Sequence, residues 1–159
     1  CDNGIVVDEH GRTSDPSIYA AGECTSHPNR FAGGRARLES VQNAVDQAKA
    51  VAASLLGRPR PYDEVPWFWS DQYEAKLQMV GISTGHDHLT IRGDPALGRF
   101  SVCYFKAGKL VAIDSVNRPS DHMTGRKLLV LGTDLTPDQA ADDSFELKSA
   151  LKPPMAAPA

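Results

Sequence analysis

The sequence predicts an α/β segment followed by an α+β domain that is built on an antiparallel sheet. Residues 1–58 contain two short apolar runs and then a long amphipathic helical pattern, whereas four strand-like runs with short turns follow residue 62. The glycine- and proline-rich stretch at 57–61 lies between the two patterns. We therefore expect domains at 1–58 and 62–151, with a flexible tail at 152–159.

The first segment shows three regular elements. Residues 5–7 are β-branched and predict a strand, and residues 18–21 predict a buried strand whose carboxyl end opens a loop at Gly22. A helix is predicted over 38–56 because apolar residues recur there at spacings of three and four. The predicted core-facing residues of this helix are Leu38, Val41, Val45, Ala48, Ala52 and Leu55.

The second segment reads as a sheet followed by helices. Strands are predicted at the ranges 73–83, 89–92, 100–105 and 110–116, and the short turns between them favour antiparallel pairing. A helix is predicted over 119–131, with proline at its first turn. Thr136 and Pro137 predict the cap and first position of another short helix.

Composition excludes several classes of protein. Seventeen basic and twenty acidic residues give a net charge of −3, which argues against a dedicated nucleic-acid binder. No run of eighteen apolar residues occurs, so we expect no membrane span. The three cysteines lie far apart without metal or disulfide spacing, which favours a reducing compartment, the cytoplasm.

The stretch 30–60 holds six basic residues and two acidic ones, which predicts either a solvated face or a surface that steers an acidic partner.

Three sequence blocks together point to one family. They are TSDPSIYAAGEC at 13–24, RLESVQNAVDQA at 37–48 and VPWFWSDQY at 65–73, and VNRP at 116–119 agrees with them. The chain resembles the FAD-dependent ferredoxin reductases of oxygenase electron-transfer chains, the putidaredoxin reductase type. This resemblance implies that 1–58 is the end of an FAD-binding Rossmann-like domain and that 62–151 is a reductase C-terminal domain.

The resemblance also implies a function for the protein. In this family electrons pass from NAD(P)H through FAD to a [2Fe–2S] ferredoxin that serves an oxygenase. The sequence contains no G-x-G-x-x-G turn for a dinucleotide pyrophosphate, so we expect the two nucleotide-binding turns upstream and an inactive isolated fragment. An alternative is that residues 62 onward form a non-catalytic interaction or dimerisation module of a flavoprotein. A flavin absorbance spectrum, or its absence, would separate the two.

The family pattern assigns cofactor contacts to four positions. Gly22 and Glu23 match the turn whose acidic residue, usually Asp, accepts hydrogen bonds from the FAD ribityl chain, although Glu23 could also be a solvated loop acid. Val41 matches a backbone N–H that points at the flavin from a helix N-terminus. Trp69 matches a tryptophan that shields the flavin, with interdomain packing as its alternative. No side chain is expected to act as a catalytic group, because the cofactor carries the chemistry.

Three basic residues are candidates for partner binding. Lys49 matches a position that meets the acidic ferredoxin in the family, and Arg35 and Arg37 lie near the same end of the predicted helix. Each could instead be an ordinary solvated charge. We expect no metal site at His86-Asp87-His88, because this turn offers no third ligand.

Overall fold

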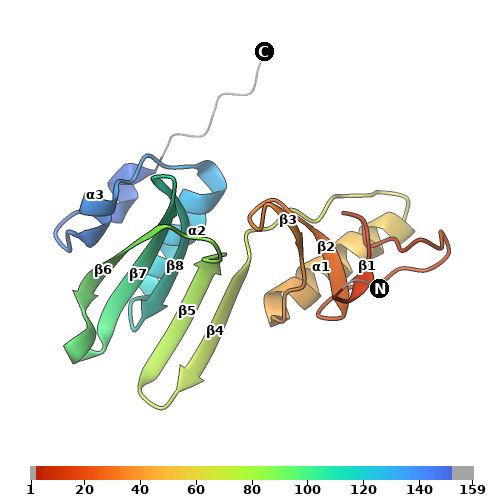
Figure 1. Cartoon of the computed structure of the whole chain (residues 1–159). Coiled ribbons are helices and arrows are strands. Elements are labelled where there is room, and N and C mark those ends of the chain that lie inside the picture. Colours follow the sequence, from red (N-terminus) through yellow and green to blue (C-terminus); the bar gives the residue numbers. More distant parts are fainter. Residues whose placement is uncertain (1–2, 152–159) are drawn as a thin grey trace. The chain divides into compact units, whose positions relative to one another are not determined.

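The computed structural model describes residues 3–151, which divide along the chain into two compact units with the boundary after Phe68. Figure 1 shows the elements of each unit. The predicted linker at 57–61 lies inside the first unit, where the Tyr62 N–H donates to the Glu9 carbonyl over 2.8 Å. The predicted tail at 152–159 lies outside the described residues.

The first unit combines a three-stranded sheet with one long helix. Its strands are β1 (Ile5–Val6), β2 (Thr25–Asn29) and β3 (Gly34–Ala36), and its helix is α1 (Val41–Leu55). Strand β2 is central, parallel to β1 and antiparallel to β3. The predicted strand near residues 5–7 is thus present, although the structure ends it at Val6.

The predicted strand at 18–21 was wrong. Only Tyr19 pairs there, in an isolated bridge with Arg12, and Ile18 is exposed. The second strand of the sheet is β2 instead, which carries the polar sequence TSHPN. Its side chains are buried because other polar groups satisfy them, which an apolar periodicity does not reveal.

Helix α1 has nearly the predicted bounds but buries a different face. Ser40 caps it, since its Oγ accepts from the Asn43 N–H at 3.1 Å. The predicted core residues Val41, Val45 and Leu55 are 58%, 47% and 65% exposed. The buried face is mostly polar and consists of Gln42, Asn43, Gln47, Ala50 and Ser54.

The second unit is a five-stranded sheet in the order β4-β5-β8-β7-β6. The strands are β4 (Trp67–Gln72), β5 (Ala75–Gly81), β6 (His88–Asp94), β7 (Arg99–Lys106) and β8 (Lys109–Val116), and the β5–β8, β8–β7 and β7–β6 pairs are antiparallel. The predicted strand at 73–83 is therefore shorter at both ends, and β4 precedes it. The chain reverses between them at Tyr73, whose φ is +51°.

Helices cover one face of this sheet. Helix α2 (Pro119–Leu131) packs on β5 and β8. Its approach to the sheet is close at Gly125, where an added Cβ would lie only 2.9 Å from Ile113 Cδ1. Helix α3 (Pro137–Ala141) begins with a capping box between Thr136 and Gln139, as predicted for a helix start there. Two 3₁₀ helices, η1 (Pro95–Leu97) and η2 (Leu147–Ala150), complete the unit. Fully buried side chains form its core, among them Val80, Cys103, Phe105, Ile113 and Leu128.

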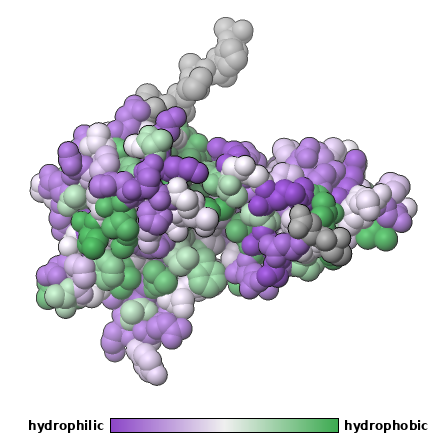
Figure 2. Space-filling view, viewed as in Figure 1, coloured by the Kyte–Doolittle hydropathy of each residue, from purple (hydrophilic) through white to green (hydrophobic). Residues whose placement is uncertain are grey.

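The other face of the sheet is partly open. Leu89 and Ile91 of β6 are exposed, and Figure 2 shows apolar side chains gathered over β6 and β7. Among residues 3–151, no helix has the length and apolarity needed to cross a membrane.

A buried ion network joins the sheet to the segment after α3. Asp121 Oδ2 accepts from Arg118 Nε at 2.6 Å and from Ser101 Oγ at 2.9 Å, and it lies 3.5 Å from Arg92 Nε. The Arg92 guanidinium also donates to the Phe145 carbonyl at 2.7 Å. Asp121 thus compensates two arginines that the fold removes from water.

Candidate cofactor and partner site

A buried hydrogen-bond network in the first unit holds the Gly22 turn against α1. Gln47 Oε1 accepts from the Gly22 N–H and from Thr25 Oγ1, each at 2.8 Å. Because this oxygen takes two donors, the Gln47 amide nitrogen faces Asn43 Oδ1 at 3.0 Å and His27 Nδ1 at 2.8 Å. One side chain therefore joins the turn, strand β2 and the helix.

His27 is a neutral acceptor in this network. Burial, and then the positive charge of Arg35, lower the pKa of His27 below its usual value of 6.5. Its Nδ1 therefore accepts the Gln47 N–H, and its ring lies edge-on to Tyr62 with centroids 5.2 Å apart. Periodicity did not identify Gln47 or His27. Gln47 is a polar residue in a helix predicted from its apolar residues, and the polar stretch that contains His27 predicts no regular element.

The N-terminal end of α1 presents free backbone donors. Asn43 Nδ2 donates to the Leu38 carbonyl at 2.8 Å, which fixes the entry to the helix. Within the described chain, the N–H groups of Val41 and Gln42 donate to no protein acceptor. Since such an end carries about half a positive charge, it suits an anionic or carbonyl oxygen.

Gln42 links this helix end to the tryptophan block. Its Oε1 accepts from the Trp67 N–H at 3.3 Å, and its Nε2 donates to Asp46 Oδ2 at 2.9 Å. The Tyr62 hydroxyl lies 3.5 Å from the same nitrogen, and burial raises the pKa of Tyr62 to about 12. Gln42 is a third residue of this network, after Gln47 and His27, whose side-chain role the sequence pattern did not indicate.

The structure places three of the predicted cofactor residues in the first unit. Gly22 has a φ of +89°, and an added Cβ would lie 3.5 Å from Ala44 Cβ, so the turn lies directly on α1. Glu23 follows it with an exposed side chain that has no partner in the part of the chain that the structure describes. Val41 opens the helix. Trp69 lies on β4 in the second unit and is 39% exposed, so its contact with flavin stays a prediction.

Arg35 is anchored to backbone oxygens. Its Nη2 donates to the Val7 carbonyl at 2.7 Å and to the Ser26 carbonyl, and its Nε donates to Ser26 Oγ at 3.3 Å. These bonds tie β3 to β2 and to the residue that follows β1. Its predicted contact with a partner would have to be made by the part of the guanidinium that these bonds leave exposed.

The other two predicted partner residues form surface ion pairs. Lys49 Nζ lies 2.8 Å from Asp46 Oδ1, and Arg37 Nη2 lies 2.6 Å from Glu39 Oε1. Both pairs are open to solvent on at least one side, Lys49 being 71% exposed and Glu39 61% exposed. Such pairs contribute about 0–1 kcal/mol to stability, so both cations can exchange partners at little cost.

No metal centre is formed by the residues from 3 to 151, where no three His, Cys, Asp or Glu side chains gather suitably. His86 and His88 instead lie against aromatic rings, those of Tyr104 and Phe105. Burial raises the pKa of Cys103 to about 12, so its thiol stays protonated and unreactive.

Comparison with known proteins places both units in described families. Residues 67–151 match the family described as reductase C-terminal, and residues 1–48 match pyridine nucleotide-disulphide oxidoreductase. The chain is 52% identical over 147 residues to the 5,5'-dehydrodivanillate O-demethylase ferredoxin reductase subunit of Sphingobium sp., covering 92% of this chain and 36% of that protein. It is also 52% identical over 150 residues to rhodocoxin reductase of Rhodococcus erythropolis, covering 94% of this chain and 35% of that one.

Solved structures agree with these matches. The ferredoxin reductase for the CYP199A2 system from Rhodopseudomonas palustris superposes with a TM-score of 0.90 at 52% identity, covering 96% of this chain and 38% of that one. The covalent putidaredoxin reductase–putidaredoxin complex superposes with a TM-score of 0.89 at 41% identity, covering 94% of this chain and 36% of that one. This chain thus spans little more than a third of the length of its relatives.

Proposed function

Because this chain belongs to the reductase C-terminal family, we propose that it is part of an FAD-dependent ferredoxin reductase that carries electrons from NAD(P)H to a [2Fe–2S] ferredoxin serving an oxygenase. The observation that carries the proposal is the 52% identity, over 92% of this chain, to the ferredoxin reductase subunit of an O-demethylase. In this protein residues 1–58 would complete the FAD-binding domain, and 62–151 would form the reductase C-terminal domain.

The residues at the N-terminal end of α1 fit part of an FAD molecule. Glu23 offers an unpaired, exposed carboxylate, which accepts hydrogen bonds from hydroxyl groups such as those of a ribityl chain. The free N–H groups of Val41 and Gln42 suit the polar edge of a flavin ring, where negative charge gathers on reduction. When bound, FAD would supply hydride acceptance and one-electron release, and the chain would supply position and polarity.

Glu23 departs from the family, which usually has Asp at this position. The extra methylene moves the carboxylate by about 1.5 Å, the length of one carbon–carbon bond. We propose that Glu23 still holds the ribityl chain because the Gly22 turn beneath it is fixed by Gln47 and by α1. Trp69 would shield the flavin from water.

Basic residues would receive the ferredoxin. Lys49 is 71% exposed at its side chain and is the principal candidate, since its pair with Asp46 is weak. Arg37 and the exposed part of Arg35 would add to the positive field that steers an acidic protein. One matched relative, putidaredoxin reductase, was crystallised as a covalent complex with putidaredoxin.

The proposal is tested with the protein that includes the preceding domains. It should purify with a flavin absorbance spectrum and should catalyse NAD(P)H-dependent reduction of an acidic [2Fe–2S] ferredoxin. Lys49→Glu should slow ferredoxin reduction at low salt and leave the reduction of a small neutral quinone unchanged, because the quinone needs no docking surface. A colourless protein without reductase activity would contradict the proposal.

That negative result would favour the second candidate, a non-catalytic interaction or dimerisation module. The second unit supports this alternative because it has its own buried core and matches a family of its own. For either function we propose a cytoplasmic location, because the three cysteines have no disulfide spacing.

A further inference from the structure

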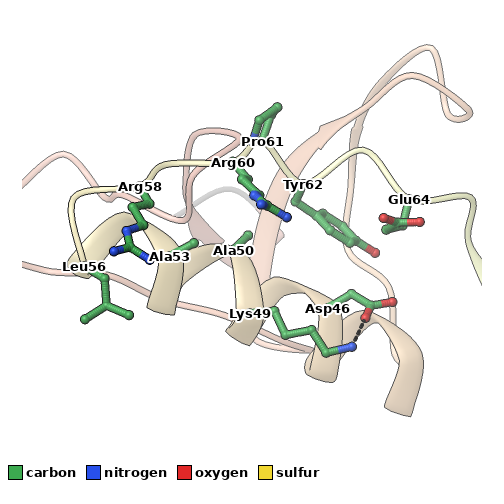
Figure 3. Close-up of a pocket in the computed structure, with 10 residues that line it drawn as sticks. All are labelled: Asp46, Lys49, Ala50, Ala53, Leu56, Arg58, Arg60, Pro61, Tyr62 and Glu64. Atoms are coloured by element: carbon green, nitrogen blue, oxygen red, sulfur yellow. Dashed lines mark hydrogen bonds and ion pairs between the residues drawn. The ribbon is translucent and has the colours of Figure 1, made fainter.

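A groove lies along the second half of α1, inside the first unit. One wall is the helix from Asp46 to its end, and the other is the segment 57–64, which returns along it (Figure 3). The cavity has a volume of about 360 Å³. Its lining residues are Asp46, Lys49, Ala50, Ala53, Leu56, Arg58, Arg60, Pro61, Tyr62 and Glu64.

The walls of this groove are preformed. The Arg58 N–H donates to the Ala53 carbonyl at 2.9 Å and the Gly57 N–H donates to the Ser54 carbonyl at 3.1 Å, which closes the helix end. The Tyr62 N–H is bound to the Glu9 carbonyl, and the Tyr62 side chain is buried. A ligand would therefore not have to order this segment, which lowers the entropic cost of binding.

The groove holds two cations of this unit that have no side-chain partner among the residues that the structure describes. Arg30 pairs with Asp63, Arg37 with Glu39 and Lys49 with Asp46. Arg58 and Arg60 form no ion pair or side-chain hydrogen bond with any residue that the structure describes. Figure 3 shows the Arg60 guanidinium above the helix near the paired Lys49 and Asp46, and the Arg58 guanidinium farther along the groove beside Ala53 and Leu56. The guanidinium groups of Arg58 and Arg60 are thus available to bind carboxylates, whose planar shape they match.

The remaining lining selects the kind of ligand. Ala50, Ala53 and Pro61 supply an apolar floor, and Leu56 at the groove's end is 77% exposed. The groove lies toward the C-terminal end of α1, which lacks the free N–H groups that hold a phosphate at a helix N-terminus. The helix dipole is negative at this end and opposes any anion, so binding of an acidic group here depends on the two arginines. A nucleotide would also lack a free aromatic face, because Tyr62 is buried. Carboxylates presented beside an apolar side chain fit this lining better than a phosphate does.

We infer that this groove is a docking subsite for an acidic segment of the protein electron acceptor. The inference rests on the proposed function, because only a ferredoxin reductase has such an acceptor. It adds Arg58 and Arg60 to the predicted contact at Lys49, and extends the docking surface to the helix end. Lys49 lies eight residues beyond Val41, a rise of about 12 Å, so the subsite binds the acceptor at a distance from the predicted flavin end.

The test uses the protein with its preceding domains and the acidic [2Fe–2S] ferredoxin that the wild type reduces fastest. The double variant Arg58→Glu/Arg60→Glu is compared with Lys109→Glu/Lys127→Glu, which makes the same charge change on exposed lysines of the second unit. We expect the arginine variant to raise KM for the ferredoxin about tenfold at low salt with kcat changed less than twofold. At 0.5 M salt the difference should fall below twofold, because charges across the groove are then screened.

The matched lysine variant should stay within twofold of the wild type, and both variants should reduce a neutral quinone normally. An unchanged KM for ferredoxin in the arginine variant would overturn the inference while leaving the proposed function intact. So would a rise in KM for NAD(P)H alone, which would assign the groove to a nucleotide, or a change in oligomeric state, which would assign it to a second copy. A wild-type protein that reduces no ferredoxin would overturn the proposed function first, and the inference with it.

Discussion

Replacing Gln47 by leucine should lower the free energy of unfolding of the first unit by much more than the small change in side-chain volume suggests. Leucine keeps much of the side-chain volume but leaves three buried groups without their partner: the Gly22 N–H, Asn43 Oδ1 and His27 Nδ1. Thr25 Oγ1 is spared, since it also reaches the Gly22 carbonyl at 2.8 Å. Each orphaned group costs about 1–3 kcal/mol, so the loss should be at least about 3 kcal/mol.

Gln47→Glu keeps the acceptor oxygen of this side chain and replaces its donor nitrogen, so it tests the two roles separately. The carboxylate keeps the acceptor for Gly22 but turns an oxygen toward His27 Nδ1, which favours a protonated imidazole and raises the pKa of His27. In the wild type the pKa of His27 is lowered, so the stability that it contributes is lost as the pH falls below about 6.5. The deficit of the Glu variant relative to the wild type should therefore shrink between pH 8 and pH 5.5.

The assay is urea unfolding followed by circular dichroism, with hydrogen exchange over residues 20–56 to isolate the first unit. Gln72→Leu is the matched control, because Gln72 is exposed and its side chain, among residues 3–151, bonds only to Ser70 Oγ, at 3.2 Å. A Gln47→Leu protein within about 1 kcal/mol of the wild type, with unchanged exchange at Gly22, would show that the network adds no net stability. A pH-independent deficit in Gln47→Glu would refute the assignment of His27 Nδ1 as acceptor.

Three further outcomes are expected. The 159-residue chain alone should bind FAD weakly, because its sequence has no glycine-rich turn for the pyrophosphate, and a sub-micromolar Kd in a fluorescence titration would contradict this. Asp121→Ala should destabilise the second unit by about 3–5 kcal/mol in urea unfolding, since Arg92 and Arg118 would lose the carboxylate between them, and a loss under about 1 kcal/mol would be inconsistent with that role. Burial, and then Arg126, lower the pKa of His122 to about 4, so the second unit should lose up to about 3 kcal/mol as the pH falls from 6.5 to 4. His122→Gln should flatten that pH profile, and an equally steep profile in the variant would assign the loss to other groups.

The elements that local residue patterns specify could be predicted from the sequence. The bounds of α2 and the start of α3 follow from Pro119 and from the capping residue Thr136, and the hairpins follow from short glycine turns. The family and the candidate residues also came from the sequence, because short blocks such as that at 65–73 carry them regardless of folding.

The buried face of α1 and the choice of segment for the central strand β2 depend on long-range contacts, which the sequence pattern did not indicate. The apolar periodicity correctly indicated a helix, but Val41 and Val45 point to solvent while Gln47 is buried. Burying Gln47 or His27 is favourable only when partners from distant segments satisfy their hydrogen bonds, and those partners lie twenty or more residues away in the sequence. A polar strand such as TSHPN cannot be predicted from hydrophobic pattern for the same reason. Its stability comes from pairing with residues that only the fold brings beside it.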